Sequence, residues 1–312
     1  MRKEAALERE SRWAVPVALA TFAAVVLFFA ALVVDSVSGD GAAEVLRSAD
    51  ENGGSAIFSA LLQAASFALL AFPLTYLFRA AAARSDRVRS QLIGLVIAAP
   101  LFLALSTGLA AVVQKEAADQ FVAGEAKSTL TQAEAKEECV EEREDEDEDF
   151  LVDEYEPTKG EDPLAACQSR KVEDDEASNA STEASAAPFA TGFGIAGGLG
   201  FVVALFYSCL WGMRTGLLSR FWGALGMALV VVTLIGLFPF LLIWFGYFGL
   251  LILGLLPGGR PPAWAAGEAI PWPTPGEKAA AELEPDDGLD GESEGGEAEG
   301  ESGPKRKRKQ RE

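Results

Sequence analysis

Three cysteines, a glycine-rich hexapeptide and a run of carboxylates are the residues of this 312-residue chain that could do chemistry. The run Glu141–Asp149 contains eight acids and one arginine. Carboxylates attract Ca²⁺ because this hard cation takes oxygen ligands, but the spacing of a calcium-binding loop, D-x-D-x-D-G-x5-E, is absent. Blocks of like charge repel one another and stay disordered. We therefore predict a solvated acidic segment and no metal site.

The glycine-rich hexapeptide Gly192–Gly197 matches the pattern G-x-G-x-x-G. A dinucleotide site also requires a strand before this pattern, whereas here a Ser/Ala-rich stretch precedes it and an apolar run follows. We instead predict close helix packing at Gly194 and Gly198, which form a G-x-x-x-G pair. The chain contains no histidine, which excludes histidine-based triads and zinc sites. We expect no catalytic residue, no cofactor and no enzymatic activity.

Cys139 and Cys167 both lie in the segment 114–188. If this segment is outside the cytosol, a disulfide between the two is chemically allowed. It would remove roughly 3–4 kcal/mol of unfolded-state entropy and give the segment a folded lobe. We predict this disulfide, with two free thiols as the alternative. Cys209 lies in an apolar run and is expected to be a small packing residue.

These residues must be positioned by long apolar helices. Half of the residues are hydrophobic and 23% are charged, and the two kinds are segregated along the chain. Apolar runs of about 18 or more uncharged residues are candidates for transmembrane helices. Such runs lie at 13–34, 57–78, 92–113 and 189–211, and a fifth covers 221–256. The last would be about 54 Å long as one helix, so we predict two helices, 221–237 and 240–256, separated near Gly236 and Pro239.

The predicted fold is therefore all-α: a polytopic transmembrane helical bundle with six spans, five being the alternative. We divide the chain into spans one to three (1–113), an acidic extracytoplasmic segment (114–188), spans four to six (189–257) and a C-terminal part (258–312). The extracytoplasmic segment has 24 acidic and seven basic residues, a net charge of −17 in a chain of net charge −20. We expect this segment to be partly disordered, with a flexible linker at 173–187.

The basic residues predict the orientation, because short cytoplasmic loops are enriched in Lys and Arg. Four basic residues precede the first run and four arginines follow the second, whereas the loop 35–56 has one arginine among five acids. We therefore place both termini in the cytoplasm of a plasma-membrane protein. The first run follows a basic stretch, as in a signal peptide, but its length favours an uncleaved membrane helix.

The C-terminal part is expected to be a disordered polyampholyte tail after a Pro/Trp-rich juxtamembrane stretch. Trp264 and Trp272 suit the headgroup region as interfacial anchors, because indole has an apolar ring and a polar N–H. The basic cluster 305–311 could contact anionic lipid of the inner leaflet, although the acids before it would offset that attraction. Nucleic acid is not an expected partner.

The composition gives two hypotheses for function. None of the apolar runs contains Asp, Glu, Lys or Arg, whereas transporters usually place ionisable groups at membrane depth. We therefore expect a non-enzymatic membrane protein whose exported segment senses, scaffolds or binds a protein partner. The alternative is a small transporter or permease. Scattered hydroxyls in the apolar runs would then provide polar groups, and Pro73, Pro100 and Pro239 would bend their helices.

The stretch 258–278, with GGRPPAW followed by AIPWPTPGEK, resembles a group of uncharacterised multi-pass membrane proteins of high-GC, actinobacterial-type bacteria. The Ala/Gly/Val/Leu-rich runs are similar as well. This resemblance implies a bacterial plasma-membrane protein and brings no catalytic residues with it.

Overall fold

The computed structural model describes residues 2–145, 162–233 and 238–273, and all regular elements in these ranges are helices. The acids 146–149 and the predicted tail beyond residue 273 lie outside the described residues. Two units are distinguished, residues 1–272 and 273–312. The description below concerns the first unit.

Four helices are long and apolar enough to cross a membrane, and each coincides with a predicted run. They are α1 (Arg2–Val34), α3 (Gly53–Arg84), α4 (Ile93–Val122, preceded by the 3₁₀ turn Ser90–Leu92) and α8 (Ala187–Arg214). Every one continues past the predicted apolar run at one end or both, because the flanking residues are good helix formers such as Ala, Glu and Arg. Pro16, Pro73 and Pro100 all lie inside continuous helices.

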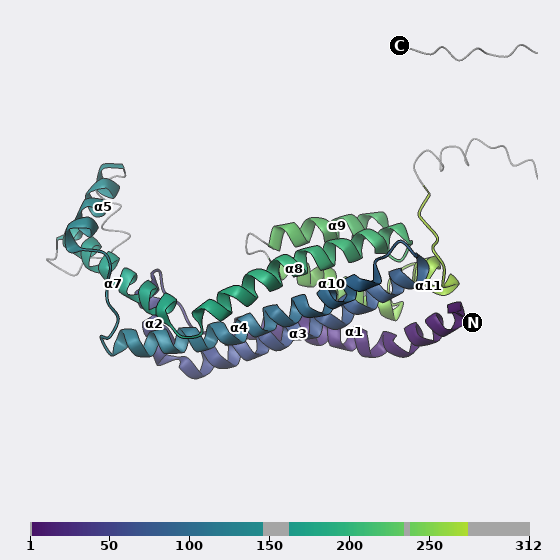
Figure 1. The fold of residues 1–312 in the computed structure, drawn as a ribbon, viewed down its shortest axis with the longest axis horizontal. Helices are drawn as coiled ribbons and strands as arrows, with labels where there is room; N and C mark the ends of the chain where they lie inside the picture. The colour runs from purple at the N-terminus through teal and green to yellow at the C-terminus, as the bar shows by residue number, and fades with distance from the viewer. Residues whose placement is uncertain (1, 146–161, 234–237, 274–312) are drawn as a thin grey trace, which may run out of the picture. The chain divides into compact units, whose positions relative to one another are not determined.

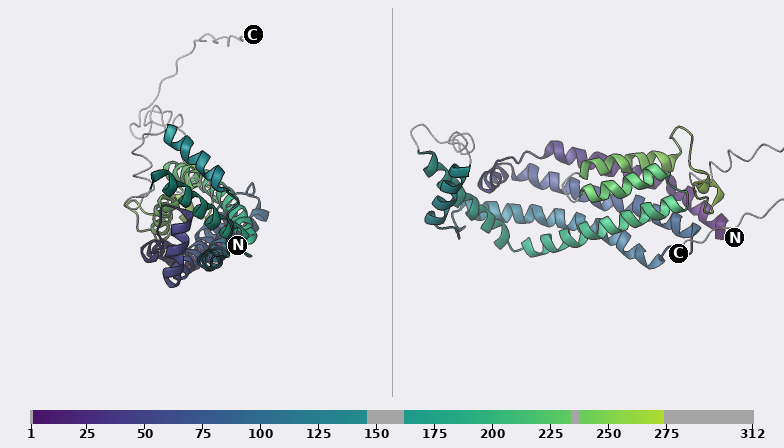
Figure 2. Two further views of the ribbon diagram at one scale, coloured as in Figure 1. Left: turned by 90° about the vertical axis from the view of Figure 1, so that its left-hand side faces the viewer. Right: turned by 90° about the horizontal axis from the view of Figure 1, so that it is seen from above.

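The four long helices lie side by side in the order α1, α3, α4, α8 (Figures 1 and 2). Two shorter helices, α9 (Arg220–Val232) and α10 (Phe238–Leu253), pack on α8 and α1, respectively. One end of this bundle has Arg79, Arg84, Arg214 and Arg220, and we call it the basic end. The opposite end carries the acidic segment.

The run 221–256 is divided into two helices, as expected, but neither has the length predicted for it. The helices have 13 and 16 residues, about 20 and 24 Å, which is short of a hydrocarbon core about 30 Å thick. Ser219 caps α9 by accepting a hydrogen bond from the Trp222 N–H. Pro239 lies in the first turn of α10, where its missing N–H removes no helical hydrogen bond.

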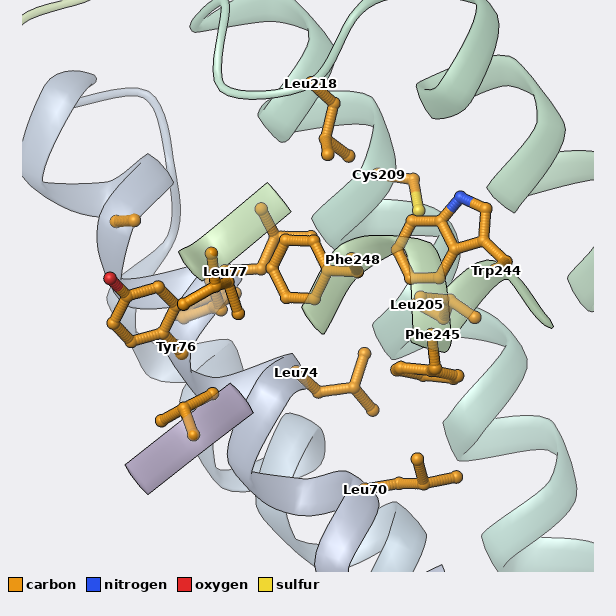
Figure 3. Close-up of a cluster of buried hydrophobic side chains, with 14 of the residues drawn as sticks. Leu70, Leu74, Tyr76, Leu77, Leu205, Cys209, Leu218, Trp244, Phe245 and Phe248 are labelled. Atoms are coloured by element: carbon orange, nitrogen blue, oxygen red, sulfur yellow. The ribbon is translucent and has the colours of Figure 1, made fainter. Parts of the chain in front are cut away.

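The core between these helices is built from large apolar side chains (Figure 3). Leu70, Leu74 and Leu77 of α3 face Leu205 of α8 and the aromatic rings of α10. Cys209 lies against Trp244, and a Cβ on Gly226 would be 2.6 Å from the Cys209 sulfur. Cys209 is fully buried, as expected for a packing residue.

The described part of the acidic segment forms two further helices and packs against a third from the loop 35–56. The loop between α1 and α3 contributes α2 (Ala42–Glu51), and the segment itself forms the end of α4, α5 (Gln132–Asp145) and α7 (Pro163–Glu183). The linker prediction for 173–187 is wrong, because α7 continues to Glu183 and α8 begins at Ala187. Ala177 and Ala180 are buried against α2 and α4, and this packing stabilises a helix that composition alone does not favour.

Candidate functional site: the acidic lobe

We call α2, α5, α7 and the end of α4 from residue 114 the acidic lobe. Cys139 of α5 and Cys167 of α7 form the predicted disulfide, with their Cα atoms 6.1 Å apart. Both cysteines are fully buried, and Leu164 packs beside them. The disulfide joins α5, which contains the first part of the acidic run, to α7, so the two helices of the lobe are covalently linked.

Asp174 of α7 caps the beginning of α2. Helix α2 has no side-chain cap of its own, since its N-cap residue is Gly41. The Asp174 carboxylate accepts a hydrogen bond from the Ala43 N–H at 2.8 Å, and a negative charge is favourable at this end of a helix. A Cβ on Gly41 would be 2.6 Å from the Asp174 carboxylate, so this close approach requires glycine at position 41.

Glu173, the preceding residue of α7, binds the side of α2. Its carboxylate pairs with Arg47 at 2.7 Å, and both side chains are about half exposed. The Arg47 guanidinium also lies 5.4 Å from the centre of the Phe121 ring in α4. Exposed pairs of this kind contribute little individually, about 0–1 kcal/mol, but this one connects α2, α4 and α7.

Asp175, the next residue, organises the loop between α4 and α5. Its carboxylate accepts hydrogen bonds from the Thr129 N–H at 2.7 Å, the Leu130 N–H at 3.0 Å and the Ser128 hydroxyl at 2.7 Å. The bond from the Leu130 N–H, followed by that from Ser128, lowers the pKa of Asp175. Bonds of this kind favour the ionised carboxylate.

A fourth carboxylate connects the lobe to α8. Glu116, near the end of α4, accepts hydrogen bonds from the Ser185 N–H at 3.1 Å and the Ser185 hydroxyl at 2.8 Å. Ser185 lies in the short turn between α7 and α8. Carboxylates that composition predicted to be solvated are therefore structural ligands of backbone N–H groups. Among the described residues, no group of three or more carboxylates and cysteines is arranged to hold a metal ion.

The glycine contacts in α8 differ from the predicted pair. A Cβ on Gly194 would be 2.9 Å from the Ser106 hydroxyl of α4, but a Cβ on Gly198 would have no neighbour within 4 Å. Gly197 and Gly200 lie against Leu103 and Ala99 of α4 instead. The close contact thus uses residues three apart, because α8 presents that row of positions to α4.

The two tryptophans of the juxtamembrane stretch lie at the basic end, Trp264 within α11 (Pro262–Ala266) and Trp272 after it. Trp264 is buried, which corrects its prediction as an interfacial anchor, and its indole N–H donates to the Leu217 carbonyl at 2.9 Å. The Trp272 N–H donates to the Leu218 carbonyl at 2.9 Å, while its ring is partly exposed. Both indoles therefore hold the turn between α8 and α9.

A buried ion pair lies beneath Trp264. Arg84 donates two hydrogen bonds to the carboxylate of Glu10, at 2.6 and 2.8 Å. The Arg84 Nε donates to the Ala263 carbonyl at 2.9 Å, and the guanidinium lies 5.4 Å from the centre of the Trp264 ring. The sequence did not indicate this pair, because Glu10, Arg84 and the α11 residues that surround the guanidinium are far apart in the chain.

Comparison with known proteins adds no assignment to this geometry. No protein-family model matches the chain, and no curated protein or solved structure matches it either.

Proposed function

We propose that this chain is a non-enzymatic integral protein of the plasma membrane, and that its acidic lobe, exposed outside the cell, binds a protein partner. In this proposal both termini are cytoplasmic and the basic end of the bundle faces the cytoplasm. The four long helices cross the membrane, and α9 and α10 form a hairpin that enters from the basic end and returns to it. The C-terminus is then on the same side whether or not that hairpin crosses fully.

The observation that carries the proposal is the way in which the lobe is attached. Consecutive carboxylates of α7 bind α2 and the loop after α4, and Glu116 binds the turn before α8. Helices α4 and α8 are themselves candidate membrane spans. A partner that displaced α7 would therefore change contacts at the ends of two spans, which is what a sensing or scaffolding role requires.

The chemistry of the partner follows from α5. Glu134, Glu137 and Glu141 of this helix are exposed. Of these, Glu137 and Glu141 have no ion-pair partner among the described residues. A partner with a basic surface would complement this face, because opposite potentials favour encounter and orientation.

Several hydroxyls of the long helices, including Ser66 and Ser106 on which the transporter hypothesis rested, join neighbouring helices. Ser59 and Ser66 of α3 donate to the carbonyls of Ala31 and Ala24 in α1. Ser106 of α4 donates to the Ala190 carbonyl of α8. Because these hydroxyls join helices rather than line an open path, they support a rigid bundle more than a permeation route.

The topology can be tested by cysteine labelling in intact cells. Ser178 is exposed on α7 in the lobe, and Ser90 is exposed at the basic end. A membrane-impermeant maleimide should label the Ser178→Cys variant in intact cells and the Ser90→Cys variant only after permeabilisation. The reverse pattern would overturn the proposed orientation.

The partner can be tested with a photo-cross-linking amino acid at position 133, an exposed residue of α5 four positions before Glu137. We expect a discrete cross-linked adduct that is reduced when Glu134, Glu137 and Glu141 are replaced by Gln. A matched cross-linker at Glu8, an exposed residue of the basic end, should not give the same adduct. An unchanged adduct in the neutralised variant would contradict recognition through charge.

A further inference from the structure

An apolar groove opens beside the basic end of the bundle, where α3 is flanked by α1 and α4. Its volume is about 350 Å³, within the range of pockets that hold small ligands. The apolar wall comprises Trp13 and Val17 of α1, Ala71 and Phe72 of α3, and Ile97 and Leu101 of α4. The groove lies apart from the acidic lobe, and Tyr76, labelled in Figure 3, belongs both to its lining and to the core cluster.

Two arginines line one end of this groove. Arg9 of α1 and Arg79 of α3 are exposed. Neither forms a hydrogen bond or an ion pair with a residue that the structure describes. The third charged residue of the lining is Glu10, whose carboxylate is paired with Arg84. The groove therefore combines an apolar wall with two positive charges that are not compensated.

The groove has the length of one membrane leaflet. Its lining on α3 extends from Ala68 to Ala80, thirteen residues that span about 18 Å of helix. This is close to half of a hydrocarbon core about 30 Å thick. In the proposed topology, Arg79 lies at the cytoplasmic boundary, so the apolar part of the groove occupies the inner leaflet.

We propose that this groove binds one phospholipid with an anionic headgroup from the cytoplasmic leaflet. An acyl chain would lie along Ala68, Ala71 and Phe72, and the phosphate would accept hydrogen bonds from Arg9 and Arg79. Guanidinium groups bind phosphate oxygens with good geometry, and basic pockets between transmembrane helices on the cytoplasmic side bind anionic lipid headgroups. The charges favour this occupant over a zwitterionic lipid.

This inference goes beyond the proposed function of the acidic lobe and uses no residue of it. It rests on the proposed orientation, which the Ser178 and Ser90 labelling experiment tests separately. A failure of lipid binding would therefore leave the proposal that the acidic lobe binds a protein partner unaffected.

The experiment uses the full chain, reconstituted in nanodiscs with equal amounts of phosphatidylglycerol and phosphatidylcholine. Lipids that stay bound after mild detergent extraction are measured by native mass spectrometry. We expect the wild type to retain one phosphatidylglycerol.

Each Arg→Gln replacement at position 9 or 79 should weaken retention about fivefold, and the double variant about thirtyfold, because a basic residue near the surface contributes about 1 kcal/mol. Arg12→Gln is the matched control, since Arg12 is exposed on the same helix and pairs with Glu8.

A second variant tests the apolar wall. Ala68→Trp should fill the groove and abolish retention of phosphatidylglycerol, whereas Ala65→Trp, one turn earlier and outside the lining, should not. The helical content of each variant is checked by circular dichroism. Equal retention of phosphatidylglycerol by the wild type and the double arginine variant would overturn the proposal, as would full retention by Ala68→Trp. The proposal would also be overturned if inorganic phosphate alone displaced the bound phosphatidylglycerol. A polypeptide bound in place of lipid in the mass spectra would overturn it as well.

Discussion

The guanidinium of Arg84 and the carboxylate of Glu10 form a two-point ion pair in which the side chains are only 1% and 9% exposed. The two residues lie in different helices, 74 positions apart. Burial makes such a pair a poor source of net stability, but the loss of one partner leaves a charge without compensation. The pair therefore specifies how α1 and α3 meet at the basic end.

We predict that Arg84→Met or Glu10→Leu alone destabilises the protein by about 3–5 kcal/mol. The combined variant Glu10→Leu/Arg84→Met should be clearly less destabilised than the sum of the two. Thermal or denaturant unfolding in detergent measures all three. Additive effects would show that the two side chains contribute independently.

The disulfide should stabilise the lobe and leave the bundle largely unaffected. Its 28-residue separation corresponds to roughly 3–4 kcal/mol in the chain-entropy model. We expect Cys139→Ser/Cys167→Ser to speed proteolysis between α5 and α7, with little change at α1 or α8. Cys209→Ser is the control for thiol loss, because Cys209 is buried in the bundle. Equal protection of α5 and α7 in both variants would refute this expectation.

The loop at Ser128–Leu130 should open at low pH. The pKa of Asp175 is lowered in the folded protein, first by the Leu130 N–H bond, so the folded state binds this proton less readily than the unfolded chain does. The stabilisation is thus complete above the ordinary value of 3.8 and is lost as the pH falls through the lower folded value. Amide exchange protection, corrected for the intrinsic rate, should fall at Thr129 and Leu130 on acidification.

Asp175→Asn should reduce that protection at neutral pH and remove most of its pH dependence. The control is Asp119→Asn, because Asp119 pairs only locally with Lys115 on the surface of α4. A profile for Asp175→Asn that still followed the wild type would assign the titration to another group.

Neighbouring glycines of α8 should respond very differently to a larger side chain. A Cβ on Gly197 would be 2.7 Å from the backbone nitrogen of Leu103, whereas Gly198 faces open space. We predict that Gly197→Leu destabilises the bundle by about 1–3 kcal/mol or more through overpacking, and that Gly198→Leu is close to neutral. The melting temperatures of the two variants in detergent test this, and similar losses would contradict the assigned contact.

The sequence predicted those features that depend on local composition. The four long helices follow from uncharged apolar runs, and the division of 221–256 follows from a proline that begins a helix more readily than it continues one. The exact helix boundaries were harder to predict, because a helix extends by several residues where the flanking Ala, Glu and Arg favour helix.

Long-range contacts could not be predicted from composition. Asp174 and Ala43 are 131 positions apart, so nothing near α7 indicates that its carboxylate caps another helix. Trp264 illustrates the same difficulty, since its ring packs against Tyr76 and Arg84, which are distant in the chain. The local signal was Gly41. This residue precedes α2 and has no side chain to cap it, so a carboxylate from another part of the chain could take that role.

The contacts of α11 have a consequence for biosynthesis. The Arg84 Nε and the carbonyls of Leu217 and Leu218 bond with residues 263–272, which the ribosome makes after all of the bundle helices. Until that late stretch arrives, the Arg84 Nε and the Leu217 carbonyl lack the groups that later shield them. The α11 residues therefore complete the contact between α1 and α3 that Glu10 and Arg84 begin. We expect quality-control proteases to degrade a nascent chain that ends before Ala263.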